Sequence, residues 1–112
     1  MAAYCQVVRK HSIVTTAGMI STNAEGQVVG SDIETQTRQT LDNLQVALEA
    51  AGAGLQDVVK TTVFIKDMAD YKGMNQVYNQ VFQEHPPARS TVRGDLVLPE
   101  LLIEIEAIAV LG

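Results

Sequence analysis

Arg89 has the clearest potential for chemistry, because it lies where a helical sequence pattern gives way to a strand pattern. The surrounding residues 86–94 read Pro-Pro-Ala-Arg-Ser-Thr-Val-Arg-Gly, so small or apolar side chains at Ala88 and Val92 flank the arginine. A planar guanidinium in such a setting suits bidentate capture of a small carboxylate. The residue pattern by itself favours the alternative, in which Arg89 forms an ion pair with one of the thirteen acidic residues.

Glu104 is the second candidate, because it interrupts a mostly apolar strand pattern over residues 101–111. Side chains alternate between the two faces of a strand, so Glu104 and Glu106 share a face with Leu102 and Val110, with their Cα atoms about 7 Å apart. Partial removal from water raises the pKa of a carboxyl group and favours proton transfer near neutral pH. Two alternatives stay open: both carboxylates face an aqueous channel, or they pair with lysines of a neighbouring strand.

Four further positions are candidates for contacts with a small ligand. Asn75 is either an exposed amide on a helix or a hydrogen-bond partner for the ligand, and Tyr4 is either a strand aromatic or a lid. Gly18 and Thr91 are candidates through their backbone groups rather than their side chains. Cys5 is more often a small hydrophobic residue than a nucleophile, because its thiolate would need a nearby cation.

The elements that position these residues follow from apolar periodicity and turn residues. Apolar side chains at spacings of three and four predict a helix over residues 33–51, with Ser31 as its N-cap and Glu34 completing a capping box. A second apolar stripe predicts a helix over residues 71–82, which two prolines stop. The expected strands are residues 5–8, 13–16, 58–66, 89–93 and 101–111, with a short extended piece at 27–29.

This order of elements, ββ(β)αβαββ, predicts a single α+β domain over residues 1–112, with a mixed β-sheet and two helices on one face. The two helices can cover only one face of the sheet, and the opposite face carries Phe64, Ile108 and Val110. An uncovered apolar face of this kind marks a protein–protein contact. We therefore expect a homo-oligomer that buries the face, with ring closure of order three as the first choice.

Composition and charge argue against several functions. The formal net charge of −5 removes the usual driving force for nucleic-acid binding. No apolar run approaches the ~18 residues of a membrane span, and the single cysteine cannot form an internal disulfide. One cysteine and two distant histidines offer no zinc-ligand spacing. We expect a cytoplasmic protein without a metal site, a nucleic-acid partner or a membrane contact.

Seven segments of the chain form a recognisable set: residues 4–6, 15–18, 36–44, 58–68, 74–78, 87–92 and 103–109. Two of them contain Pro-Ala-Arg-Ser and Ile-Glu-Ile-Glu-Ala-Ile-Ala, which are highly specific when they occur together. In this order, and along nearly the whole chain, the segments resemble the RidA (YjgF/L-PSP) family of enamine/imine deaminases.

This resemblance implies a chorismate-mutase-like fold of the bacillus type and a homotrimer with clefts between subunits. It also implies cofactor-independent hydrolysis of reactive 2-enamine and 2-imine acids, such as 2-aminoacrylate and 2-iminobutyrate, to 2-keto acids and ammonia. By the resemblance, Arg89 binds the substrate carboxylate, Glu104 orients or activates water, and the backbone at Gly18 and Thr91 holds the polar end. The other positions that line the family's cleft are Asn75 and Tyr4.

Three departures from the family pattern keep other functions open. Thr91 stands where many members have cysteine, residues 19–21 read Met-Ile-Ser instead of the common Gln-Ile-Pro, and the sequence begins almost at Tyr4. One alternative is a non-catalytic trimer that binds small carboxylates or a partner protein. Another is RNA cleavage or translation inhibition, a label that some relatives carry, which the negative charge and the absence of stacked aromatics disfavour.

Overall fold

A computed structural model describes residues 2–112 and contains one mixed sheet, two α-helices and two short 3-10 turns. The helices are α1 (Ile33–Ala50) and α2 (Tyr71–Phe82), and the 3-10 turns are η1 (Leu55–Asp57) and η2 (Met68–Asp70). The strands are β1 (Val7–Lys10), β2 (Ile13–Thr16), β3 (Met19–Ile20), β4 (Val58–Ile65), β5 (Ala88–Arg93) and β6 (Ile103–Val110).

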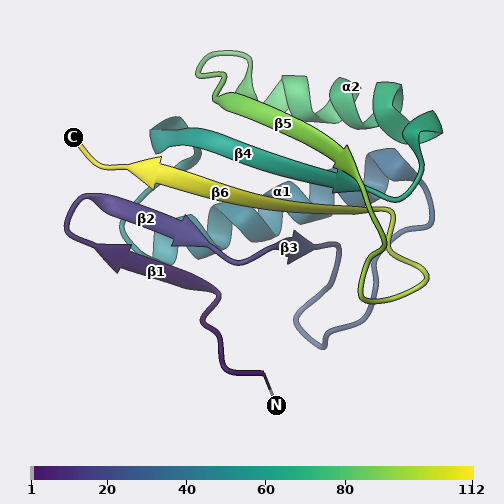
Figure 1. Cartoon of the computed structure of the whole chain (residues 1–112), viewed down its shortest axis with the longest axis horizontal. Coiled ribbons are helices and arrows are strands. Elements are labelled where there is room, and N and C mark those ends of the chain that lie inside the picture. Colours follow the sequence, from purple (N-terminus) through teal and green to yellow (C-terminus); the bar gives the residue numbers. More distant parts are fainter. Residues whose placement is uncertain (1) are drawn as a thin grey trace.

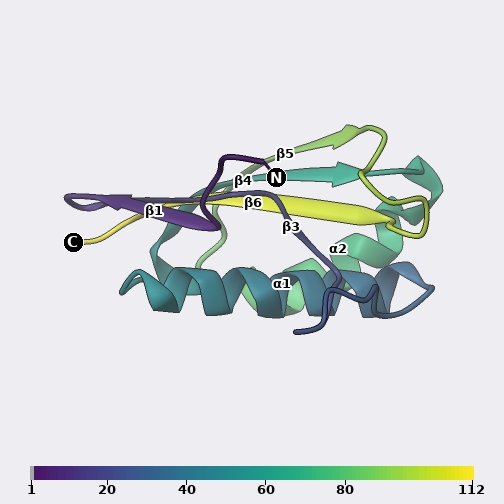
Figure 2. The same ribbon diagram turned by 90° about the horizontal axis from the view of Figure 1, so that it is seen from below.

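The sheet runs in the order β1-β2-β6-β4-β5, and the short strand β3 pairs with the free part of β6 beyond β2 (Figure 1). Only β4 and β5 are parallel, because α2 carries the chain back between them, as a parallel pair requires. Both helices lie on one face of the sheet (Figure 2). The expected α+β fold, with two helices on one face of a mixed sheet, is therefore confirmed.

The core lies between this face and the helices, and β6 shows how the sequence builds it. Ile103, Ile105, Ala107 and Ala109 are all buried, whereas the alternating side chains of the same strand are half-buried or exposed. On α1, the buried stripe is Ile33, Thr37, Leu41, Leu44 and Leu48. The period of two predicted the buried residues of the strand, and the period of about 3.6 predicted this stripe of the helix. The polar residues Gln36 and Thr40 of α1 are also buried, and the apolar pattern did not predict them.

The opposite face of the sheet has no helix over it and carries apolar side chains. Val92, Ile108 and Val110 are each about two-fifths exposed, and Phe64 is half-buried. The cross-strand register places Phe64 beside Val92 on one side and beside Glu104 on the other. We refer to this surface, made of Phe64, Val92, Glu104, Ile108 and Val110, as the outer face.

Several expected boundaries were wrong, each for a local reason. Asp32, not Ser31, is the N-cap of α1, because its Oδ2 accepts a hydrogen bond from the Thr35 amide at 2.9 Å. That bond, made to the ionised form, lowers the pKa of Asp32. The first hairpin turns at His11, which has a φ of 55°, so β1 ends at Lys10, two residues beyond the end expected at residue 8.

The extended piece expected at residues 27–29 is reduced to one isolated bridge between Thr22 and Val28. No strand had been expected at β3, which is only two residues long and forms because β6 offers it a partner. Neither described helix is long and apolar enough to cross a lipid bilayer.

Candidate functional site

Arg89 lies on the edge strand β5 and points to the helix-covered side of the sheet. Its register partner on β4 is the buried Thr61, and side chains of paired residues share a face. The Arg89 Nη2 atom donates to the Tyr71 hydroxyl at 3.1 Å, and Nη1 lies 4.0 Å from the Met74 sulfur. The guanidinium carbon lies 4.7 Å from the centroid of the Tyr78 ring.

Within residues 2–112, the side-chain hydrogen bonds of Arg89 go to the hydroxyl of Tyr71 and the sulfur of Met74, which are both uncharged. The expectation that Arg89 pairs with an acidic residue of the chain is therefore wrong for this structure. The Tyr71 hydroxyl, the Met74 sulfur and the Tyr78 ring form no ion pair with the guanidinium, and most of its five N–H donors stay free. This state suits it to bind a carboxylate from outside the chain.

Two more candidate residues lie beside Arg89 and carry unsatisfied oxygen atoms. Thr91 is two residues along β5 on the same face, and Asn75 is one turn along α2 from Tyr71. The Thr91 Oγ1 and Asn75 Oδ1 atoms are buried and have no hydrogen-bond partner. A buried polar atom without a partner costs about 1–3 kcal/mol, so a ligand or another chain that offered either atom a hydrogen bond would remove that cost. We call Tyr71, Asn75, Arg89 and Thr91 the arginine half-site.

Glu104 and Gly18 form a second group on the outer side of the sheet. Glu104 alternates with the buried Ile103 and Ile105, so its side chain points away from the helices. Its carboxyl group packs against Gly18 so closely that a Cβ atom on this glycine would lie 2.2 Å from Glu104 Oε2. We call Gly18 and Glu104 the glutamate half-site.

The surroundings of Glu104 disfavour its charged form. Partial burial, and secondarily the negative charge of Glu106, raise the pKa of Glu104 above its ordinary value. The lysines that could have paired with it are engaged elsewhere: Lys60 Nζ donates to Ser90 Oγ at 2.9 Å, and Lys66 Nζ donates to the Pro99 carbonyl at 2.7 Å. A carboxyl with a raised pKa can exchange a proton with a substrate near neutral pH.

A single protomer does not bring Arg89 and Glu104 together. They lie on opposite faces of the sheet, and β4 separates their strands, which puts the two strands roughly 10 Å apart. Tyr4 is exposed and, with Gly18, lines a hollow of about 590 Å³ beside β3 and α1. The residues that line this hollow include neither Arg89 nor Glu104.

Sequence reasoning did not select Tyr71 as a site residue, although its hydroxyl accepts a hydrogen bond from Arg89. The available signal was its spacing of four residues from Asn75, which puts both side chains on one side of a helix. The sequence pointed instead to an acidic partner for Arg89, because the contact of Arg89 with Tyr71 depends on how α2 packs against β5.

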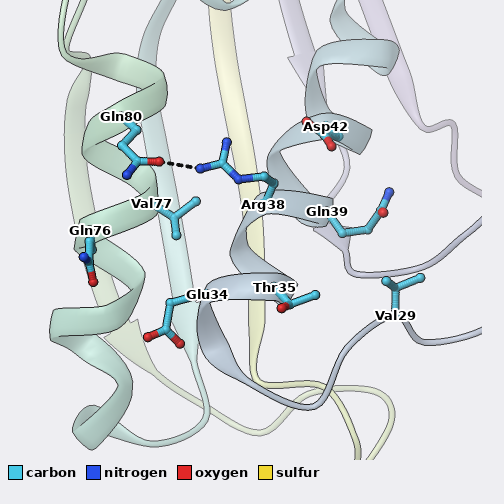
Figure 3. Close-up of a pocket in the computed structure, with 9 residues that line it drawn as sticks. All are labelled: Val29, Glu34, Thr35, Arg38, Gln39, Asp42, Gln76, Val77 and Gln80. Carbon is cyan, nitrogen blue, oxygen red and sulfur yellow. Dashed lines mark hydrogen bonds between the residues drawn. The ribbon is translucent and has the colours of Figure 1, made fainter.

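A separate groove of about 610 Å³ runs between the two helices (Figure 3). Arg38 of α1 donates to Gln80 of α2 across it, and the Val77 side chain points into the space between the helices. The groove contains none of the residues that the sequence analysis selected. Within residues 2–112, no cluster of three His, Cys, Asp or Glu residues could hold a metal ion.

Comparison with known proteins identifies the family to which this chain belongs. The sequence model of the family described as "Endoribonuclease L-PSP" matches residues 1–111. The 2-iminobutanoate/2-iminopropanoate deaminase of Escherichia coli K12 is 43% identical over 110 residues, which cover 96% of this chain and 86% of that protein. The RutC family protein PH0854 of Pyrococcus horikoshii is 45% identical over 107 residues, which cover 95% and 85%.

Solved structures give the same result. The crystal structure of the E. coli yjgF product superposes with a TM-score of 0.89 at 42% identity, covering 98% of this chain and 89% of that one. E. coli TdcF with bound serine superposes with a TM-score of 0.91 at 37% identity, covering 100% and 91%. The chain therefore belongs to the L-PSP endoribonuclease family, also known as the YjgF/RidA family.

Proposed function

We propose that this protein hydrolyses 2-imino acids, and the enamines that tautomerise to them, to 2-keto acids and ammonia. The observation that carries the proposal is the unneutralised guanidinium of Arg89, which lies beside two buried oxygen atoms that lack partners. A small anion with a carboxylate and a polar group next to it would satisfy both features. The similarity to a named 2-iminobutanoate/2-iminopropanoate deaminase supports this substrate class.

The chemistry requires little from the protein. Water adds to the imine carbon, the carbinolamine that forms loses ammonia, and the C=N bond is replaced by a C=O bond without any change of oxidation state. In this proposal Arg89 fixes the carboxylate of the substrate, and the Glu104 carboxyl orients the water and relays its proton to the leaving nitrogen. Fixed orientation of the reactants can supply most of the acceleration, and no step requires a metal or an organic cofactor.

The site needs two protomers, because Arg89 and Glu104 lie on opposite faces of one sheet. We propose a homotrimer in which the outer face of each protomer packs against its neighbour, and the arginine half-site of one chain meets the glutamate half-site of the next. An edge strand that meets the face of another sheet is a heterologous contact, and such a contact forms a closed ring of three when the rotation between neighbouring subunits is a third of a full turn, as we propose here. The exposed Val92, Ile108 and Val110 support burial of the outer face.

In the same proposal, Gly18 and Thr91 contribute backbone groups to the polar end of the substrate, and Asn75 and Tyr4 line the cleft. The close packing of Glu104 against Gly18 and the unpaired side-chain oxygen of Asn75 support the placement of Gly18 and Asn75 at the cleft. The position of Thr91 two residues from Arg89 on β5 supports its own placement there. Tyr4 is about two-thirds exposed in one protomer, which leaves it accessible to a neighbouring chain. The residue composition also leads us to propose a cytoplasmic location.

The decisive assay measures ammonia and 2-keto acid release from a 2-imino acid that an amino-acid oxidase generates in the same cuvette. We expect release above the uncatalysed rate, and we expect Arg89→Ala to lose about 2–5 kcal/mol of substrate binding. Undiminished activity in Arg89→Ala would refute the mechanism.

Two other functions would give different results in parallel assays. Tight binding of 2-ketobutyrate without any turnover would favour a carboxylate-binding protein. RNA degradation by metal-free protein that is lost in Arg89→Ala would favour the ribonuclease activity named in the family's description. The net charge of −5 leads us to expect no RNA degradation.

A further inference from the structure

Tyr71 is the first residue of α2, and its hydroxyl is the oxygen acceptor that holds the Arg89 guanidinium. The Nη2–hydroxyl distance is 3.1 Å, and the guanidinium carbon lies 5.7 Å from the centroid of the Tyr71 ring. Tyr78 also lies beside the guanidinium, but its hydroxyl is paired with Thr61 Oγ1 at 2.7 Å in the buried interior. Tyr78 therefore contacts the guanidinium through its ring alone, whereas Tyr71 contacts it through both its ring and its hydroxyl.

The Tyr71 hydroxyl carries no charge, and this matters for the binding of a substrate carboxylate to Arg89. A carboxylate at the position of the Tyr71 hydroxyl would neutralise Arg89 and compete with the substrate for its donors. A phenol fixes one Nη2 donor and leaves the positive charge available. An unrestrained arginine side chain has about 2 kcal/mol of rotamer entropy, part of which it would lose on binding a ligand. The contact with Tyr71 removes part of this freedom before the substrate arrives.

We propose that Tyr71 is a positioning residue, whose hydroxyl holds the Arg89 guanidinium in the orientation that receives the substrate carboxylate. The inference rests on the proposed function, because it assigns Arg89 to the carboxylate. Tyr71 is about two-fifths exposed, so its hydroxyl lies near the surface and its removal leaves the core packing intact. The Asn75 side chain and the charge of Arg89 both lower the pKa of the Tyr71 hydroxyl, in keeping with its place beside a cation.

The test compares wild type, Tyr71→Phe, Arg89→Ala and the control Gln76→Ala. Tyr71→Phe keeps the ring and deletes only the hydroxyl, and Gln76 is an exposed residue of the same helix. Two assays are used: one measures KM and kcat for a 2-imino acid generated in situ, and the other measures Kd for 2-ketobutyrate by calorimetry. The calorimetric arm reports on the carboxylate site whether or not turnover occurs.

We expect Tyr71→Phe to raise both KM and Kd about tenfold, with kcat within about twofold of wild type, because a lost positioning contact weakens binding in the ground and transition states alike. Gln76→Ala should leave all three values unchanged. A merely structural role for Tyr71 would instead lower the melting temperature of Tyr71→Phe and leave KM and Kd near wild type.

The outcomes separate the two proposals. Wild-type KM and Kd in Tyr71→Phe, together with large increases in Arg89→Ala, would overturn the positioning role and leave the proposed function intact. Wild-type KM and Kd in Arg89→Ala would overturn the proposed function, and the role of Tyr71 with it.

Discussion

Gly18→Ala moves the Glu104 carboxyl without changing its charge, and it is therefore a sharp test of what that group does. The added Cβ atom would lie 2.2 Å from Glu104 Oε2, 2.6 Å from Cδ and 2.9 Å from Cγ. Because ordinary contacts begin at about 3.5 Å, the carboxylate must withdraw by about 1 Å. Gly18 does not have a positive φ, so an alanine fits its backbone conformation.

The size of the effect follows from this displacement. A misplacement of about 1 Å in a reacting group can cost about 10²-fold in rate, which corresponds to roughly 2.7 kcal/mol of transition-state stabilisation. The cost in folding stability should be small, below about 1 kcal/mol, because the displaced atoms end a flexible side chain on the outer face. Gly18→Ala should therefore lose activity while it keeps its fold.

The assay is kcat/KM for 2-imino acid hydrolysis, measured beside the thermal melting temperature. Gly94→Ala is the matched control, because a Cβ atom there meets nothing within 4 Å and its φ is not positive. It should keep wild-type activity and be equally or slightly more stable, since alanine restricts the unfolded chain. Wild-type kcat/KM in Gly18→Ala would refute the view that the position of the Glu104 carboxyl matters for the reaction.

Three further changes test the electrostatics, the core and the outer face. Burial raises the pKa of Glu104, so the folded state binds the proton of this carboxyl more tightly than the unfolded state does. The stability that comes from this tighter proton binding is lost as pH rises from the ordinary pKa through the raised pKa. Glu104→Gln should therefore melt higher than wild type at neutral pH and not below pH ~4, where the unfolded carboxyl is also protonated; a pH-independent difference would contradict this cause. Tyr78→Phe leaves the buried Thr61 hydroxyl without its partner and should lower the free energy of unfolding by about 1–3 kcal/mol in urea titrations, and an unchanged midpoint would count against this bond. Ile108→Asp puts a charge on the outer face and should shift the protein toward monomers in sedimentation experiments, and an unaltered oligomer would show that this face is not the interface.

The elements of the fold could be predicted from the sequence because their signals are local and periodic. The alternation along β6 gave its buried residues correctly, whereas the apolar stripe on α1 missed the buried Gln36 and Thr40, which are polar. The N-cap could not be resolved between Ser31 and Asp32, since both residue types cap well and their positions differ by one. The two-residue strand β3 has no pattern of its own and exists only through pairing with β6.

The sequence offered candidate site residues but not their arrangement in space. Arg89 and Glu104 were both selected, yet the face that each occupies depends on the pairing of β5 and β6 with β4. No local pattern encodes that pairing. The same limit hid Tyr71, whose contact with Arg89 is set by the packing of α2 against the edge strand.

The central claim, that one chain supplies Arg89 and its neighbour supplies Glu104, is tested most directly by subunit mixing. Arg89→Ala and Glu104→Gln chains, each inactive alone, are unfolded together in equal amounts, refolded and assayed for 2-imino acid hydrolysis. Random trimers formed this way should regain about a quarter of the wild-type activity, because about three quarters of them are mixed and each of these restores one intact site in three. Activity that stays at the level of the separate variants, in trimers shown to be mixed, would contradict a site shared between chains.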